Sequence, residues 1–344
     1  MPGRRPRLTP AIADVRRAVR QGLEQADAAF VLVALSGGPD SLALAAATAF
    51  EAERSGRRAG AVIVDHGLQQ GSDAVAERAA RQARALGLGP VSVVRVSVDD
   101  GRADGRTDGR AAAGGPEAAA RTARYAALDE ALRTTGADHM LLGHTLDDQA
   151  ETVLLGLARG AGAASLSGMA PVTGTRMRPL LGIRRATTEA FCADSGLDPW
   201  HDPHNLEDRF SRVRVRQSVL PVLESELGPG IAEALARTAE QLREDDETLH
   251  DIATETIEDL VEHAEAGIAV SARALAANPP ALRNRIIRYV VESEFGVSPS
   301  RVQTLAVAAL VTDWHGQKGV DLPGIRVVRQ GALLVFTRTG HHEG

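Results

Sequence analysis

The chain has 344 residues, a formal net charge of −6 and a single cysteine, Cys192. Its length suffices for two domains. One cysteine excludes a disulfide framework and any metal cluster held by cysteines within one chain. No apolar stretch is long enough to span a bilayer, and no apolar signal-peptide core follows the basic N-terminus, so we expect no membrane contact and a cytoplasmic location. The acidic net charge requires that any RNA contact come from a local basic surface.

The first two hundred residues alternate short apolar runs with helical patterns. Strands are predicted at residues 30–35, 61–64, 91–96 and 139–142, and helices at residues 42–54, 73–86 and 117–135. Gly56, Gly87 and Gly136 each follow a helical pattern, where a left-handed C-cap favours glycine. This alternation predicts an α/β fold with an open, doubly wound parallel sheet, whose ligands bind outside the carboxyl ends of the strands.

The first predicted strand leads into the segment Ser36-Gly37-Gly38-Pro39-Asp40-Ser41, and an Ala/Leu-rich helix follows. Glycine lets the backbone turn sharply and approach a ligand closely, and the unpaired amides at a helix N-terminus attract an anion. We therefore expect a phosphate-binding loop, although a bare turn of this kind could also be a tight connection. It is not a Walker A loop, because the only lysine of the chain is Lys318. Amides, arginines or a metal must then meet the phosphate charge.

Residues 99–115 are of low complexity, and we expect a mobile loop there.

The pattern changes after the first two hundred residues. Helical patterns cover residues 212–226, interrupted at Pro221, then 231–265 with a dense acidic face, 283–294 and 301–311, before strand-like runs at 325–329 and 332–337. We expect one domain at residues 1–211 and a second, mostly helical domain with terminal strands at residues 212–344. The acidic face is most simply solvated surface.

Two clusters of polar residues lie where ligands of such a sheet bind. Asp65-His66-Gly67-Leu68 ends the second predicted strand, and Glu117-Ala-Ala-Ala-Arg121 with Arg124 and Tyr125 opens a helix. An ordinary turn explains the first cluster equally well. A surface ion pair between Glu117 and Arg121, four residues apart, is the alternative for the second.

A third cluster, from Gly143 and His144 through Asp147, Asp148 and Glu151, follows the fourth predicted strand. Asp147 and Glu151 are four residues apart, so both carboxylates project from one face of a helix. Such a pair can hold Mg²⁺ with waters and phosphates, or an ammonium group. Helix capping by Asp147 or Asp148 is the alternative, but it explains one acid rather than three beside a histidine.

An arginine-rich segment ends the first predicted domain. Arg212, Arg214 and Arg216 follow the sequence Asp202-Pro-His-Asn205. These arginines share no single helical face, so they could contact phosphates from more than one side. A solvated helix between domains is the alternative.

Taken in order, these clusters resemble those of the tRNA(Ile)-lysidine synthases, a family of N-type ATP pyrophosphatases. The matching segments lie at residues 36–41, 65–68, 117–125, 144–152, 178–181 and 202–216. The first segment alone is shared by the whole PP-loop superfamily. Two features depart from the family pattern: residues 99–115 are longer than the family's loop, and the chain has one C-terminal domain where longer members have a second.

The resemblance implies an ATP-dependent ligase that forms a carbon–nitrogen bond. ATP adenylates the carbonyl oxygen at carbon 2 of the wobble cytidine in a CAU-anticodon isoleucine tRNA, and the amine of L-lysine then displaces AMP to give lysidine. The departure of pyrophosphate needs stabilisation of negative charge, and the amine attacks only when neutral. The implied partners are this tRNA and L-lysine, with ATP as substrate and Mg²⁺ as cofactor. A homodimer is one option for the oligomeric state.

The resemblance also implies roles for individual residues. The catalytic set is Asp40, Arg121, Asp147 and Glu151; the ATP-binding set is Ser36, Gly37, Gly38, Pro39, Asp40, Ser41, Asp65, His66, Gly143 and His144; the tRNA-binding set is Arg124, Arg212, Arg214 and Arg216; and Asp40 and Asp147 are candidate Mg²⁺ ligands.

Three other functions compete with this interpretation. A tRNA thiolase of the same fold needs cysteines to carry sulfur, and Cys192 lies away from the motifs. A small-molecule synthetase that adds an amine to an adenylated group stays open. A catalytically inactive nucleotide sensor or RNA-binding module would lack Asp40, or both Asp147 and Glu151, and all three are present.

Overall fold

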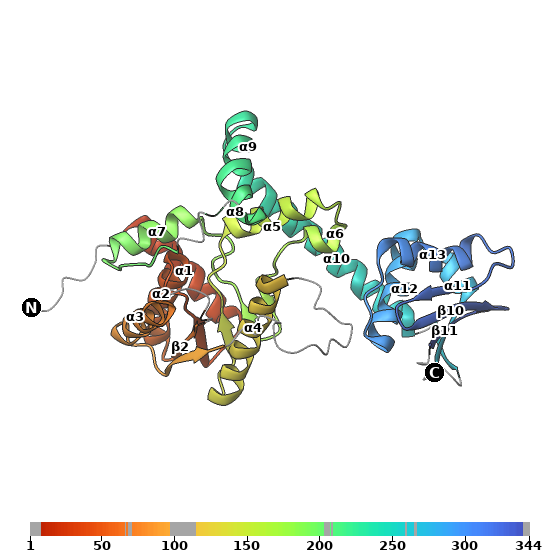
Figure 1. Ribbon diagram of the computed structural model, residues 1–344, viewed down its shortest axis with the longest axis horizontal. Coiled ribbons are helices and arrows are strands. Elements are labelled where there is room, and N and C mark those ends of the chain that lie inside the picture. Colours follow the sequence, from red (N-terminus) through yellow and green to blue (C-terminus); the bar gives the residue numbers. More distant parts are fainter. Residues whose placement is uncertain are drawn as a thin grey trace, which may run out of the picture. The chain divides into compact units, whose positions relative to one another are not determined.

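The computed structural model describes residues 8–65, 67, 71–96, 115–202, 207, 209–258, 260–264 and 267–339. The chain divides into two compact units, Met1–Gln241 and Leu242–Gly344 (Figure 1). The division expected between residues 211 and 212 rests on the change in sequence pattern there, and it stays a prediction. The low-complexity segment at residues 99–115 lies, apart from Gly115, outside the described residues.

A six-stranded sheet in the order β3-β2-β1-β4-β6-β5 organises the first unit. The strands are β1 (Phe30–Ala34), β2 (Arg58–Asp65), β3 (Val91–Arg95), β4 (His139–Leu141), β5 (Val172–Thr173) and β6 (Arg176–Met177). All neighbours are parallel except β5, which runs antiparallel to β6. The four predicted strands are confirmed. The β5–β6 hairpin escaped prediction because a two-residue strand leaves no apolar run in the sequence.

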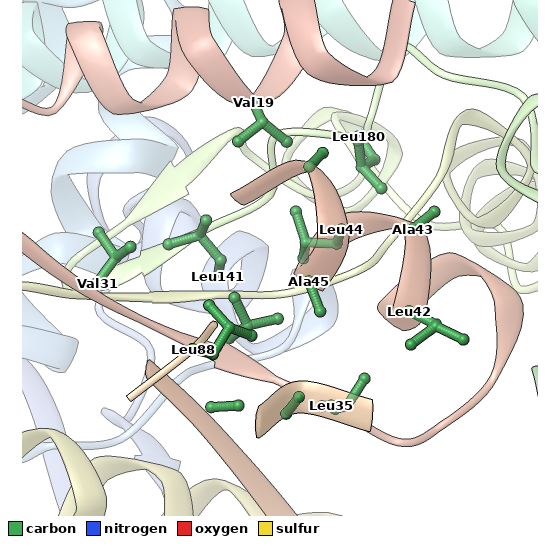
Figure 2. Close-up of a cluster of buried hydrophobic side chains, with 14 of the residues drawn as sticks. Val19, Val31, Leu35, Leu42, Ala43, Leu44, Ala45, Leu88, Leu141 and Leu180 are labelled. Carbon is green, nitrogen blue, oxygen red and sulfur yellow. The ribbon is translucent and has the colours of Figure 1, made fainter. Parts of the chain in front are cut away.

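Helices cover both faces of this sheet. They are α1 (Pro10–Gln25), α2 (Pro39–Ser55), α3 (Ser72–Ala85), α4 (Gly115–Thr135), α5 (Leu146–Ala158), α6 (Ala163–Leu166) and α7 (Arg185–Asp194). Alternate residues of β1 face opposite sides, so Val31 packs with Val19 of α1 and Leu44 of α2 (Figure 2), whereas Leu32 packs with Leu128 of α4. The doubly wound α/β fold is thereby confirmed, and Gly56, Gly87 and Gly136 have the positive φ expected after a helix.

The sheet order places a topological switch point beside β1. The chain passes from β1 to β2 and β3 on one side, and β4 pairs with the other side of β1. Ligands of open α/β sheets bind in the crevice outside the carboxyl ends of the strands at such a point. The loops that follow β1 and β4 border this crevice, and they contain the first and third sequence clusters.

A further run of helix completes the first unit. It consists of α8 (Ser211–Arg214), a π-helical turn at Val215–Val219, α9 (Leu220–Leu227) and the beginning of α10 (Ile231–Glu258). Pro221 lies in the first turn of α9, where a missing N–H is tolerated. The interruption that the sequence predicts at Pro221 is therefore a π-helical turn directly before it, not a break.

A five-stranded antiparallel sheet in the order β7-β8-β11-β10-β9 organises the second unit. Its strands are β7 (Val261–Ala264), β8 (Gly267–Ser271), β9 (Val320–Leu322), β10 (Ile325–Gln330) and β11 (Leu333–Arg338), and its helices are α11 (Ala272–Ala277), α12 (Pro280–Phe295) and α13 (Arg301–Thr312). Val290 of α12, Val307 of α13 and Phe336 of β11 share one buried core.

The helices predicted at residues 283–294 and 301–311 and the last two strands of this unit are confirmed, whereas α11 was not predicted and the sheet is larger than the sequence indicated. Residues 261–264 extend the predicted acidic helix in the sequence pattern, whereas the chain leaves the helix at Glu258 and pairs these residues with β8. Ladder pairing with a neighbouring strand is a tertiary effect, and helical periodicity does not register it. None of the helices within the described ranges is long and apolar enough to cross a membrane.

Candidate active site

The loop Ser36–Ser41 has an ordered backbone that its own serines hold in place. The Ser41 hydroxyl donates to the Gly38 carbonyl at 3.1 Å and accepts from the Ser36 amide at 3.2 Å. Gly37 has φ +87°, a conformation that favours glycine, and its carbonyl accepts from the Trp200 amide at 2.9 Å. Because α2 begins at Pro39, its positive N-terminal end lies at this loop. The geometry suits a bound phosphate.

Gly38 and Gly143 have different surroundings, so the absence of a side chain has a different consequence at each position. A Cβ at Gly38 would make only ordinary contacts, at 3.6 Å from Ser36 Oγ and 3.9 Å from the Trp200 carbonyl. A Cβ at Gly143 would lie 3.1 Å from the Cα and the amide nitrogen of Ser41. The loop after β4 therefore packs against the loop after β1 through a glycine, and this contact joins the two sides of the crevice.

Asp40 lies in the first turn of α2, and its carboxylate is turned toward α7. One oxygen accepts from the Thr188 hydroxyl and the other from Arg185 Nε at 3.5 Å. Burial raises the pKa of Asp40, and the hydrogen bond from Thr188 and the charge of Arg185 oppose that shift. Asp40 thus touches α7 as well as belonging to the phosphate loop.

The acids of α5 take different structural roles. Thr145 and Asp148 form a capping box, in which the Asp148 carboxylate accepts from the Thr145 amide at 2.8 Å. The capping alternative is therefore correct for Asp148. Its second oxygen accepts from Arg185 Nη2 at 2.8 Å and lies 3.5 Å from Arg216 Nη2, so the same side chain also belongs to a charge cluster.

Glu151 is the centre of this charge cluster. Its side chain is fully buried, and it accepts from Arg216 Nε at 2.7 Å, Arg212 Nε at 3.0 Å and Arg185 Nη1 at 3.3 Å. A buried charge without partners would be strongly destabilising, and several guanidinium partners compensate for its lost hydration.

Asp147 differs from Glu151 because it keeps contact with solvent. Its side chain is 17% exposed, and it accepts from the Arg185 backbone amide at 2.7 Å, which makes it a cap for the N-terminus of α7. Arg184 Nη2 lies 3.5 Å from its other oxygen. A cavity of about 140 Å³ opens beside these groups; its lining consists of Asp147, Glu151, Arg184, Arg185, Arg216, Leu220, Pro221, Glu224 and Ala232.

A larger cavity of about 510 Å³ lies between α1 and residues 171–183. Its lining contains none of the four acids Asp40, Asp147, Asp148 and Glu151. The smaller cavity is therefore the one that is relevant to the predicted chemistry.

His144 lies beside the charge cluster as a neutral imidazole. Burial, opposed by the negative charge of Asp148 and assisted by the positive charges of Arg178, Arg212 and Arg121, lowers the pKa of His144 to about 4. Its Nδ1 atom is buried and has no hydrogen-bond partner among the described residues. At neutral pH the Nδ1 atom can therefore form one hydrogen bond with a ligand while the ring stays uncharged.

The remaining predicted residues are more dispersed. Asp65 is buried at the end of β2 and accepts from the Gly67 amide at 3.0 Å; His66 lies outside the described residues. Arg121 donates to the Tyr125 hydroxyl at 3.2 Å on α4, the helix that also carries Arg124. The charge of Arg121 influences His144 from that position.

The three predicted tRNA-binding arginines do not share one environment. Arg212 and Arg216 both contact Glu151, whereas Arg214 is exposed and donates to the Arg209 carbonyl at 3.1 Å. The role of the three in RNA binding stays a prediction, and two of them also belong to the charge cluster.

Sequence reasoning missed Arg184 and Arg185. They follow the segment 178–181 within an arginine-rich chain, so neither their type nor their spacing is distinctive. Only the packing of α7 against α2 brings Arg185 to Asp40 and the α5 acids. A periodicity argument has no access to such a contact.

The site suits Mg²⁺ only in part. Across the described ranges, no group of three or more His, Cys, Asp or Glu side chains is arranged to hold a metal ion. Asp40 and Asp147 each already accept a hydrogen bond from Arg185, so each has few free lone pairs. Protein sites for Mg²⁺ usually supply one or two carboxylates, and substrate phosphates and waters supply the remaining ligands. Asp40 and Asp147 could serve as those two carboxylates.

Comparison with known proteins agrees with this geometry. Residues 12–223 match the PP-loop domain family, and residues 271–333 match the TilS substrate binding domain. The U34-tRNA thiolase NcsA from Methanococcus maripaludis, solved with its [4Fe-4S] cluster, is similar in structure, with a TM-score of 0.56 and 21% identity over 68% of this chain and 79% of that chain. At that identity the likeness concerns the fold alone.

Two relatives are similar along nearly their whole length. The tRNA(Ile)-lysidine synthase of Leifsonia xyli subsp. xyli is 65% identical over 312 residues, which cover 90% of both chains. That of Thermobifida fusca is 48% identical over 333 residues, 95% of this chain and 98% of the relative. The resemblance in the motifs is confirmed, and the chain belongs to the tRNA(Ile)-lysidine synthase family.

Proposed function

We propose that this chain is an ATP-dependent ligase that forms lysidine at the wobble cytidine of a CAU-anticodon isoleucine tRNA. The observation that supports this most directly is a charge cluster of carboxylates and arginines beside a phosphate loop, at the switch point of a PP-loop fold. A phosphate loop serves the activation by ATP, and carboxylates next to a cavity serve an amine nucleophile.

In the first step the loop Ser36–Ser41 binds the phosphates that leave as pyrophosphate. The carbonyl oxygen at carbon 2 of cytidine attacks the α-phosphorus of ATP, an O–P bond forms, and the bond to pyrophosphate breaks. The loop amides and Arg121 stabilise the charge that develops on the leaving oxygens. Asp65, Gly143 and His144 complete the nucleotide site, and neutral His144 offers a hydrogen bond rather than a charge. Mg²⁺, held chiefly by the phosphates, supplies further charge neutralisation when bound.

In the second step the ε-amine of L-lysine attacks carbon 2 of the adenylated cytidine. A C–N bond forms, the C–O bond to AMP breaks, and the ammonium loses its proton. Asp147, which keeps 17% exposure and lines the cavity, is placed to receive that ammonium, and Glu151 and Asp148 maintain the negative charge behind it. The amine must be neutral to attack, so one carboxylate accepts the proton.

The mixed charges of the cavity fit a free amino acid better than a simple diamine. Asp147 can meet an amine of lysine, and Arg184 and Arg216 can meet its α-carboxylate. Cadaverine has the two amines of lysine but no carboxylate. We therefore expect it to be a poor substitute for lysine at equal concentration.

The residues that match the substrate-binding domain contain more basic than acidic side chains, and this excess supports a role in tRNA binding. Residues 271–333 contain eight Lys or Arg against four Asp or Glu, whereas helix α10 contains two arginines against nine acids. The acidic net charge of the chain thus comes from a helix outside the matched substrate-binding domain, and counterion release at residues 271–333 can still drive tRNA binding. Arg124, Arg212 and Arg214 would contact the strand that enters the first unit.

The experiment that tests this function measures incorporation of labelled lysine into RNA and release of pyrophosphate. The purified chain receives ATP, Mg²⁺ and lysine with an isoleucine tRNA transcript that has a CAU anticodon, or with the methionine tRNA of the same anticodon. We expect lysine incorporation with the isoleucine transcript alone. Lysine-dependent pyrophosphate release without RNA would refute the assignment and favour the small-molecule synthetase.

Thiolation is disfavoured by the cysteine of this chain. Iron–sulfur clusters are usually held by several cysteine thiolates, and this chain has only Cys192. Burial raises the pKa of the Cys192 thiol to about 12, so it is a thiol packed in the core rather than a sulfur carrier. The cytoplasmic location and the homodimer stay predictions, which cell fractionation and light scattering can test.

A further inference from the structure

Arg185 connects the two halves of the proposed site. Its side chain is 17% exposed, and it lies within hydrogen-bonding or ion-pair distance of Asp40 on α2 and of Asp148 and Glu151 on α5, at 3.5, 2.8 and 3.3 Å. Its backbone amide donates to Asp147 at 2.7 Å. One residue therefore touches all four acids of the site.

The first turn of α7 explains this placement. Arg185 is the first residue of the helix, so its amide has no intrahelical partner and is free to donate to Asp147. Thr188, one turn later, donates to Asp40, and Phe191 and Cys192 anchor the helix in the core below α2. The guanidinium is thus carried by a rigid element rather than by a loop.

The acids depend on Arg185 to different degrees. Glu151 has two further arginines, Arg212 and Arg216, and Asp148 has Arg216 and the amide of Thr145. Asp40 has the Thr188 hydroxyl, and among the described residues Arg185 is the cation in contact with it. The phosphate loop is therefore the part of the site whose charge balance rests most on Arg185.

We propose that Arg185 is a positioning residue that couples the phosphate loop to the amine-binding acids. This inference rests on the proposed function. A guanidinium presents five donors in a fixed plane, so it can hold Asp40, Asp148 and Glu151 in one arrangement at the same time. A lysine at this position would supply the charge but, as a point charge on a flexible stem, could not hold the three acids in one geometry.

This distinction allows charge and geometry to be tested separately. In Arg185→Gln, Asp40, Asp148 and Glu151 lose both the charge and the planar donor set of the guanidinium. We expect kcat/KM for lysine to fall about 10²-fold, a typical effect of misplaced reacting groups. In Arg185→Lys, the charge beside Asp40 is kept, so we expect ATP binding to match that of the parent protein, whereas the KM for lysine stays raised.

Arg20→Gln is the matched control. Arg20 holds the buried carboxylate of Glu51 through two hydrogen bonds, at 2.8 and 3.1 Å, between α1 and α2. The substitution removes the arginine partner of a buried acid in the same unit but changes no residue of the proposed site. We expect its KM for lysine to match that of the parent protein.

The outcomes are distinguishable. A parent protein that incorporates no lysine into tRNA refutes the proposed function itself. If the parent is active and Arg185→Lys has the same KM for lysine as the parent, Arg185 is not a positioning residue. Should Arg185→Gln fail to fold, Arg185→Lys alone decides the matter, since a raised KM for lysine with unchanged ATP binding supports the coupling and an unchanged KM overturns it.

Discussion

Replacement of Glu151 by Gln tests whether the charge cluster holds the first unit together. The substitution keeps the shape of the side chain and removes its charge. Glu151 accepts four hydrogen bonds from three arginines, at 2.7, 3.0, 3.1 and 3.3 Å. Glutamine retains one acceptor oxygen and turns an NH₂ group toward arginine donors, so half of these hydrogen bonds cannot form.

The magnitude follows from the number of hydrogen bonds and the exposure of the partners. Removal of two hydrogen bonds to charged groups corresponds to roughly 3–6 kcal/mol. The three arginines are 17–38% exposed and recover part of their hydration, so we expect a destabilisation of about 3 kcal/mol after this discount. For a unit of this size that corresponds to a decrease of about 6–12 °C in the melting temperature.

Differential scanning calorimetry is the appropriate assay, because a chain with two compact units need not unfold in one transition. Glu51→Gln is the control, since Glu51 is also buried but pairs with one arginine, and we expect a smaller decrease. If Glu151→Gln melts no lower than Glu51→Gln, the charge cluster does not stabilise the unit. A variant that melts lower yet transfers lysine at the parent rate would limit the cluster to a structural role.

Three further predictions address the loop, the RNA and the cysteine. Gly38→Val should abolish pyrophosphate release and leave the melting temperature nearly unchanged, because the Cβ meets only ordinary contacts in the protein but lies where phosphates bind; a soluble variant with normal turnover would contradict the nucleotide site. Arg214→Gln should reduce the log–log salt dependence of tRNA binding by about 0.7–0.9 for each phosphate that Arg214 neutralises, measured by filter binding, and leave the KM for lysine unchanged, whereas Arg212→Gln should alter both. Cys192→Ala should retain lysine transfer, and the native thiol should react slowly with iodoacetamide because burial raises its pKa to about 12; a folded variant that no longer transfers lysine would reopen the thiolase interpretation.

The sequence indicates the parts of this protein that depend on local patterns. The four predicted strands of the first sheet are short, mostly apolar runs, and the loop Ser36–Ser41 has a distinctive residue order. Asp147 and Glu151 can be identified because a spacing of four residues puts side chains on one helix face. Each of these inferences needs only neighbours in the sequence.

Features that depend on distant contacts are not accessible in this way. β7 pairs with β8 although its residues continue a helical pattern, and Arg185 meets Asp40 across 145 residues of chain. The sequence suggests a cap as the alternative role of Asp148, yet its second oxygen binds arginines of two other elements. Sequence spacing can suggest which charged side chains share a helix face. It does not reveal which opposite charges from distant segments will pair with them.

The balance of charge explains how the site can select its ligands. Asp40, Asp147, Asp148 and Glu151 lie among Arg184, Arg185, Arg212 and Arg216, so four carboxylates face four guanidinium groups. A ligand of one sign must displace a protein group of the same sign and leave that group without its counterion. A zwitterion can take one carboxylate and one guanidinium together, so under the proposed function we expect an amino acid with a second amine to be favoured. The arginines of the cluster are already paired, so we expect the phosphates of ATP to rely on the loop amides, Arg121 and Mg²⁺.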